Sequence, residues 1–265
     1  MKRTQIEDEL TAKFKHAGLE QPGLEARLLL QEIPDGPDLI AKVEAWAVRR
    51  IRGEPLAYLS GKKGFYKSEF FVESGVLVPR PETEHVVEVA LERGHDVRYL
   101  ADLGCGSGCL GLSLLHELPQ AKLYAVDLNP KACAVTTRNA QAMNLIERVQ
   151  VLQQSVEQWQ PLFLLDLVVA NPPYIAQDDP DVQPSVRDFE PSEALFSGRD
   201  GLDAIRLWTR WASHFLAPGG LWVCEFGAGQ TESVREIMAQ LPFAQVQIHR
   251  DLSGKERVVS AIKES

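Results

Sequence analysis

The chain has 265 residues, of which 45% are hydrophobic and 25% charged, a composition typical of globular proteins with a buried core. Its formal net charge of −9 argues against a protein that coats nucleic acid, since such binding needs a basic face that neutralises phosphates. The four cysteines form no C-x-x-C pair and have no zinc-site spacing, so we expect neither a disulfide framework nor a metal. No signal peptide and no apolar run of about 20 residues is evident, which predicts a cytoplasmic protein without membrane spans.

Residues 1–63 predict a small helical domain. Apolar residues such as Leu24 and Leu28 recur there at helical spacing, and the proline cluster at 34–37 separates the helices. We expect this domain to serve in substrate recognition or packing, because nothing in it suggests chemistry. Residues 64–80 predict a β-hairpin linker from apolar residues interleaved with polar ones. Those apolar residues are Phe65, Phe70, Val72, Val76 and Val78.

Residues 81–265 predict a catalytic α/β domain with a mostly parallel sheet, because strands and helices alternate. Thr83 is a candidate cap for a helix over Glu84–Arg93. The stretch 175–198 is long, polar and proline-bearing, which in a compact domain is usually functional. The seven expected strands are 97–103, 122–127, 149–154, 166–170, 221–226, 245–249 and 257–262.

A glycine-rich loop follows the first of these strands. It contains Gly104, Cys105, Gly106, Ser107 and Gly108. Glycines let the backbone turn tightly and approach a ligand, and the N–H groups of the following helix face the same crevice. Asp127 lies nineteen residues past Gly108 and is placed to accept hydrogen bonds from ribose hydroxyls. The loop also satisfies the dinucleotide pattern G-x-G-x-x-G, so an NAD enzyme remains an alternative at this point.

The fourth strand runs into Asn171-Pro172-Pro173-Tyr174. The nitrogen of an amide or amino group carries N–H donors and a delocalised lone pair, so it needs hydrogen-bond acceptors around it. Asn171 offers a side-chain carbonyl, and Pro172 has no N–H, so its backbone offers only carbonyls. Tyr174 can stack on a planar group. The motif therefore predicts a methyltransferase acting on a planar nitrogen.

At its glycine loop the chain resembles class I S-adenosylmethionine-dependent methyltransferases, whose first motif is acidic-x-Gly-x-Gly-x-Gly. The resemblance implies that Asp127 holds the ribose and that the loop, with Asn171, passes beside the methionine part. S-adenosylhomocysteine would be the product, and no metal is implied. In the region where the family contacts adenine, Ser155 is placed to bond the adenine amino group and Val156 to pack on the ring.

The Asn-Pro-Pro-Tyr motif occurs in adenine-N6, guanine-N2 and glutamine-N5 methyltransferases. Nearly the whole chain resembles the protein-(glutamine-N5) methyltransferases that act on peptide chain release factors, most specifically at residues 79–84, Glu225-x-Gly227 and 251–258. That resemblance implies a monomer acting on the glutamine of the Gly-Gly-Gln loop of class 1 release factors, with no nucleic-acid substrate. Asn171 and the Pro172 carbonyl would grip the carboxamide.

Three alternatives stay open: a ribosomal-protein glutamine methyltransferase, a nucleic-acid amino methyltransferase, and a binding module that keeps a cofactor site without turnover. Other residues receive simpler interpretations. Arg80 either positions a ligand or pairs with Glu82 or Glu225. His85 is expected to be a surface helix residue, and Trp208 and Trp211 are expected to lie in the core.

Overall fold

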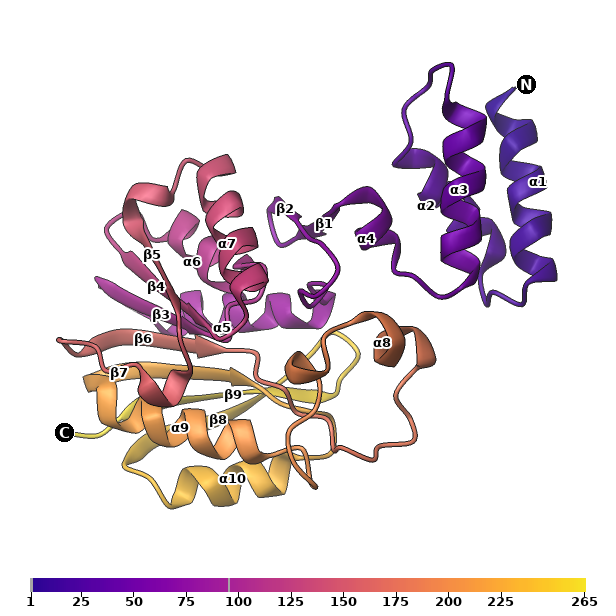
Figure 1. The fold of residues 1–265 in the computed structure, drawn as a ribbon. Helices are drawn as coiled ribbons and strands as arrows, with labels where there is room; N and C mark the ends of the chain where they lie inside the picture. The colour runs from indigo at the N-terminus through magenta and orange to yellow at the C-terminus, as the bar shows by residue number, and fades with distance from the viewer. Residues whose placement is uncertain (1, 95) are drawn as a thin grey trace. The chain divides into compact units, whose positions relative to one another are not determined.

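The structure is a computed structural model that describes residues 2–94 and 96–265 (Figure 1). The chain divides into two compact units. One extends to Lys62 and includes the segment Val182–Phe189, and the other comprises Lys63–Asp181 with Glu190–Ser265. Among the described residues, no helix combines the length and the apolar character needed to cross a bilayer.

The first unit is helical. Its core forms because apolar residues recur at i, i+4 spacing, as Ile6, Leu10 and Phe14 do on the first helix, and pack against Leu29 of the second. The helices are α1 (Arg3–His16), α2 (Pro22–Gln31), α3 (Leu39–Ile51), α4 (Leu56–Ser60) and α8 (Pro184–Phe189).

The second unit contains a seven-stranded sheet of order β5-β4-β3-β6-β7-β9-β8 within the described residues. All neighbours are parallel except for β9, which is antiparallel to β7 and β8. This confirms the predicted α/β class with a mostly parallel sheet. The strands are β3 (Tyr99–Leu103), β4 (Lys122–Asp127), β5 (Val149–Gln153), β6 (Leu165–Ala170), β7 (Leu216–Glu225), β8 (Phe243–Arg250) and β9 (Glu256–Lys263).

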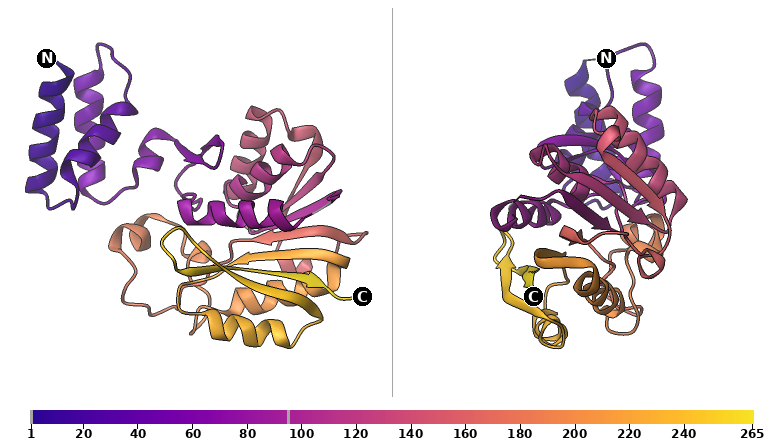
Figure 2. Two further views of the ribbon diagram at one scale, coloured as in Figure 1. Left: turned by 180° about the vertical axis from the view of Figure 1, so that it is seen from behind. Right: turned by 90° about the vertical axis from the view of Figure 1, so that its left-hand side faces the viewer.

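Helices cover both faces of the sheet (Figures 1 and 2). One apolar layer packs against α5 (Glu84–Arg93), α6 (Cys109–Glu117) and α7 (Pro130–Ala142). The other packs against α9 (Asp203–Phe215) and α10 (Thr231–Ala239). Because β6 is central and covered on both sides, its sequence is a nearly continuous apolar run, as predicted.

The hairpin is shorter than the sequence predicted. Its strands are β1 (Lys62–Phe65) and β2 (Ser68–Phe71), joined through Tyr66 with φ of 52°. Val76 and Val78 lie beyond it in irregular backbone, and Val76 is buried against Ala132 and Val135 of α7. Their alternation therefore reflects burial in a loop and not strand pairing.

The prediction that the Thr83 side chain caps α5 is also wrong. A short 3₁₀ turn, Pro81–Thr83, precedes α5, and the Thr83 side chain makes no capping hydrogen bond. Thr83 is 2% exposed and makes a tertiary contact with the candidate site instead.

Leu112 tests the packing of the sheet unit, since it lies on α6 and is fully buried in the apolar layer between that helix and the sheet. Leu112→Ala is expected to lower the free energy of unfolding by about 2–5 kcal/mol through lost burial and the cavity left behind. The matched control is Leu162→Ala, because Leu162 is 100% exposed and its loss should stay within about 0.5 kcal/mol. Urea unfolding followed by circular dichroism measures both, and equal losses would contradict the assigned core.

Candidate active site

A cavity of about 600 Å³ opens at the carboxyl ends of β3, β4 and β6, within the sheet unit. This is the edge at which open parallel sheets bind ligands. Of the predicted site residues, the cavity is lined by Gly104, Cys105, Gly106, Ser107, Asp127, Ser155, Val156, Asn171 and Pro173. Pro172 is buried, and Gly108 begins α6 as its N-cap with φ of 78°.

The glycine loop is shaped by close contact with an aromatic ring. Gly104 has φ of 69°, and a Cβ there would lie 2.5 Å from the Cη2 atom of Trp208. Trp208 is partly exposed and lines the cavity, so it is not simply a core residue. Trp211 does lie in the core, where its indole N–H donates to the Trp159 carbonyl at 2.9 Å.

Asp127 ties the end of β4 to this loop. Its Oδ2 accepts the Gly106 N–H at 2.9 Å, and its Oδ1 accepts the Asn129 N–H at 2.8 Å. Burial raises the pKa of this carboxyl, against the lowering effect of both backbone donors. Each oxygen still has a further lone pair, so Asp127 can fix the loop and accept from a ligand at the same time.

Asp102 lines the cavity and occupies the acidic position of the acidic-x-Gly-x-Gly-x-Gly motif. It is 1% exposed, and its Oδ2 accepts the Gly111 N–H at 2.9 Å. Its Oδ1 has no partner among the described residues, and burial raises its pKa to about 7. An unpartnered acceptor of this kind suits a cationic or N–H-bearing ligand.

The side chains of Asn171 and Tyr174 are held by hydrogen bonds to residues outside the motif. The Asn171 Nδ2 donates to Thr83 Oγ1 at 3.1 Å, so its Oδ1 is left as an acceptor. The Tyr174 hydroxyl donates to Glu225 Oε1 at 3.0 Å. Burial raises the pKa of Tyr174 far above its ordinary value, and the nearby Glu225 charge adds to that rise.

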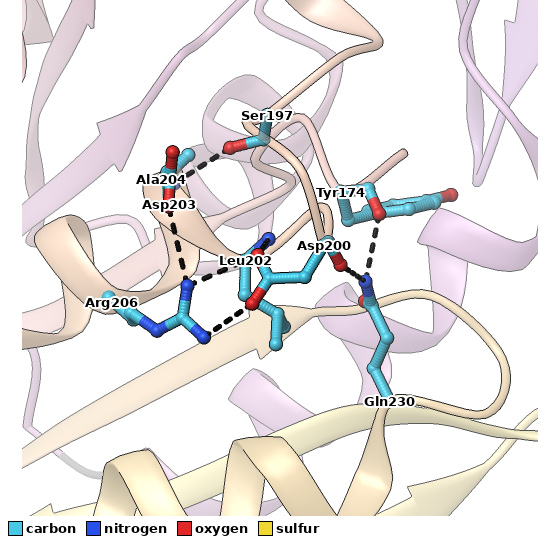
Figure 3. Close-up of polar contacts among 8 residues, drawn as sticks. All are labelled: Tyr174, Ser197, Asp200, Leu202, Asp203, Ala204, Arg206 and Gln230. Carbon is cyan, nitrogen blue, oxygen red and sulfur yellow. Dashed lines mark hydrogen bonds and ion pairs between the residues drawn. The ribbon is translucent and has the colours of Figure 1, made fainter. Parts of the chain in front are cut away.

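The backbone after the motif is clamped by Gln230 (Figure 3). Its Nε2 donates to the Tyr174 carbonyl at 2.9 Å and to the Asp200 carbonyl at 3.3 Å, while its Oε1 accepts the Gly227 N–H at 2.8 Å. Gly201 permits this approach, since a Cβ there would lie 2.3 Å from the Tyr174 carbonyl oxygen. No local pattern indicates this role for Gln230, because its contacts with Tyr174 and Asp200 span 56 and 30 residues.

Arg80 pairs with neither of its expected partners. Its Nη2 lies 2.5 Å from Glu190 Oε1, and Glu190 Oε2 accepts the Val78 N–H at 3.1 Å. Arg80 lines the cavity, and so do residues of the long connection close to Glu190, namely Pro191, Glu193 and Ala194. This pair, of a buried Glu190 and a partly exposed Arg80, joins two segments of the cavity wall. His85 instead lies 3.0 Å from Glu88 and does not line the cavity.

The cavity can accommodate an adenosyl cofactor. The glycine loop and Asp127 occupy one part of it, and Leu128, Ser155 and Val156 line it as well. Asp102 adds the unpartnered acceptor described above. Among the described residues no cluster of three or more His, Cys, Asp or Glu side chains is arranged to hold a metal ion.

Comparisons with known proteins define the class. Residues 84–188 match the family model described as "Methyltransferase small domain". The S-adenosylmethionine-dependent O-methyltransferase of Thermotoga maritima has the same fold, with a TM-score of 0.52, 13% identity, and coverage of 72% of this chain and 67% of that one. The chain therefore shares its fold with this methyltransferase, and residues 84–188 match a methyltransferase family model.

Sequence relatives narrow the class further. The chain is 37% identical to the release factor glutamine methyltransferase of Moorella thermoacetica over 96% of both chains. It is 33% identical to a bifunctional methyltransferase of Rickettsia conorii, over 96% of this chain but only 56% of that protein. The chain belongs to the release factor glutamine methyltransferase family.

The contact between Gly104 and Trp208 predicts a specific loss of stability. Gly104→Ala should lose about 1–2 kcal/mol from the left-handed backbone and about 1–3 kcal/mol more from overpacking against the indole. Gly219→Ala is the matched control, since φ there is 82° and nothing lies within 4 Å of the added Cβ. Urea unfolding measures both variants, and the extra loss should vanish in a Trp208→Ala background. Equal losses at the two glycines would refute the contact.

Asp102 predicts a pH-dependent stability in the cofactor-free protein. The folded protein keeps a proton on Asp102 up to about pH 7, whereas the unfolded chain releases it near the ordinary pKa of 3.8. As the pH rises from 3.8 to about 7, the unfolded state binds fewer protons than the folded state, so stability falls. Asp102→Asn cannot titrate and is the reference. The wild-type free energy of unfolding, minus that of Asp102→Asn, should decrease across this window. A constant or rising difference would contradict the buried, protonated carboxyl.

Proposed function

We propose that this protein transfers the methyl group of S-adenosylmethionine to the side-chain amide nitrogen, N5, of a glutamine in a release factor. Family membership supports the reaction and the substrate class. The observation that carries the chemistry is the orientation of Asn171. Its amide hydrogens are directed to Thr83, and its carbonyl oxygen is left beside the glycine loop cavity.

An amide nitrogen reacts poorly because its lone pair is shared with the carbonyl. In the proposed complex, Asn171 Oδ1 and the Pro172 backbone carbonyl accept the two N–H groups of the substrate carboxamide. Pro172 and Pro173 contribute no N–H that would compete for these acceptors, and their rings restrict the backbone before substrate arrives. Hydrogen bonds that lie out of the amide plane draw the hydrogens away and leave the lone pair free to point at the methyl group.

The bound cofactor supplies a methyl group on a positively charged sulfur with a neutral thioether as leaving group. A C–N bond forms as the C–S bond breaks, once the reacting atoms are held about 3–3.5 Å apart. The nitrogen then bears a positive charge and loses one proton to solvent, so this chain needs no strong general base. Asp127 would hold the ribose, Ser155 and Val156 the adenine, and the unpartnered Asp102 oxygen the methionine ammonium group.

The glutamine of the Gly-Gly-Gln loop of class 1 release factors is the proposed substrate, as the family resemblance implies. The net charge of −9 suits a protein substrate better than duplex DNA. We assign recognition of the release factor to the helical domain over residues 1–63, with 64–80 as linker and 81–265 as catalytic domain. Monomeric state and cytoplasmic location stay predictions.

A side-by-side labelling experiment tests the substrate. The protein is incubated with labelled S-adenosylmethionine and, separately, a release factor, the same factor with its Gly-Gly-Gln glutamine replaced by alanine, ribosomal proteins, and DNA. We expect label on the intact release factor and none on the alanine variant. Label confined to DNA or to a ribosomal protein would refute the release factor as substrate, and label on the alanine variant would refute the glutamine.

Asn171→Ala tests the acceptor. Loss of one preorganised polar group typically lowers the catalytic rate by about 10²–10³-fold, and we expect that range for kcat on a release factor. The control is Gln141→Ala, which removes an exposed amide side chain on α7 and should leave kcat unchanged. Unaltered turnover by Asn171→Ala in a single-turnover assay would be incompatible with the role given to Asn171.

A further inference from the structure

A buried hydroxyl lies behind the reactive motif, on a segment 88 residues earlier in the chain. Thr83 ends the 3₁₀ turn before α5 and is 2% exposed. Its side chain does not cap α5, although threonine is favoured at that position. Its Oγ1 accepts the Asn171 Nδ2 hydrogen at 3.1 Å instead. The hydroxyl is therefore committed to the active-site asparagine.

Glu225, at the end of β7, holds the other polar side chain of the motif, Tyr174. It is 1% exposed, and its Oε1 accepts the Tyr174 hydroxyl at 3.0 Å. Its Oε2 has no partner of normal hydrogen-bond geometry among the described residues. Burial raises the pKa of Glu225, and the hydrogen bond from Tyr174 opposes that rise by stabilising the charged form. The Tyr174 hydroxyl is thus bonded to this buried carboxyl, whereas the Thr83 hydroxyl is bonded to Asn171.

The donors and acceptors at this contact decide what the cavity receives. A threonine hydroxyl has one hydrogen to donate and two lone pairs that can accept. In the structure the Thr83 oxygen is the acceptor for Asn171 Nδ2. The Asn171 amide therefore turns its NH₂ to Thr83 and keeps Oδ1 as the acceptor for the cavity. The opposite orientation would present N–H donors to a substrate that itself carries N–H donors.

We propose that Thr83 is a positioning residue that fixes the orientation of the Asn171 carboxamide by accepting its Nδ2 hydrogen. The inference rests on the proposed function, since only a substrate with N–H donors requires an acceptor at Asn171. The orientation of Asn171 is nevertheless measurable without any substrate, so the two claims are separable.

The decisive variant is Thr83→Val, which keeps the shape of the side chain and removes the hydroxyl. Loss of one orienting hydrogen bond should lower kcat on a release factor by about 10-fold. Cofactor affinity by calorimetry and the melting temperature should stay close to wild type. Thr83→Ser retains the hydroxyl and should restore most of the rate. Thr137→Val is the matched control, because it removes a hydroxyl that donates to the Cys133 carbonyl within α7.

Nuclear magnetic resonance supplies the readout that needs no activity. The side-chain NH₂ signals of Asn171, assigned by their disappearance in Asn171→Asp, should exchange slowly with solvent in the wild type and in Thr83→Ser, and faster in Thr83→Val. Wild-type kcat in Thr83→Val, equal losses in Thr83→Val and Thr83→Ser, or NH₂ exchange that is the same in all three proteins would each overturn the proposal. If the wild type methylated no release factor while the exchange pattern held, the proposed function alone would fail.

Discussion

The constraint on which the rest of the site depends is that the end of β6 must offer hydrogen-bond acceptors with no competing donor. A donor in that position would repel the N–H groups of an amide substrate. The two prolines have no backbone N–H groups. The side-chain NH₂ of Asn171 donates to Thr83 Oγ1, which leaves the Asn171 carbonyl oxygen as the acceptor. What is left facing the cavity is an acceptor, which is the requirement for methylating a planar nitrogen.

Holding that surface in place requires the surrounding fold to be rigid. The central position of β6 fixes where the motif begins, and Gln230 fixes the carbonyl of its last residue (Figure 3). The cavity wall formed by the glycine loop is fixed in a comparable way, since the side chain of Asp127 accepts a hydrogen bond from the Gly106 N–H. Arg80 and Glu190 join two further segments of the wall. Each contact uses a buried or partly buried polar group whose partner is supplied by a different element.

The sequence predicted the strands and α5 well, and it placed the two motifs after β3 and β6, because these features depend on local pattern. Apolar runs identify buried strands, and a glycine loop between a strand and a helix has few other uses. The hairpin was overextended because a buried loop can show the same alternation as a strand, as Val76 does. Thr83 was misassigned because capping preference is a local tendency, which a tertiary hydrogen bond overrode here.

What the sequence could not provide was the layer behind the motif. The contacts of Asn171 with Thr83 and of Tyr174 with Glu225 span 88 and 51 residues. Those of Arg80 with Glu190 and of Gln230 with Tyr174 span 110 and 56. No local pattern encodes such pairs, since they form only when separate strands are brought together at one edge of the sheet. The sheet order that makes them neighbours is itself a product of the whole fold.

The most direct test of an acceptor site for a planar nitrogen is to locate the transferred methyl group. A release factor is methylated to completion by this protein and fragmented by tandem mass spectrometry. The acceptor geometry predicts one added methyl group on the side-chain amide nitrogen of a single glutamine, and a far smaller methylated fraction with Asn171→Ala after the same time. A methyl group found on a lysine amine, a carboxylate or a hydroxyl would contradict it.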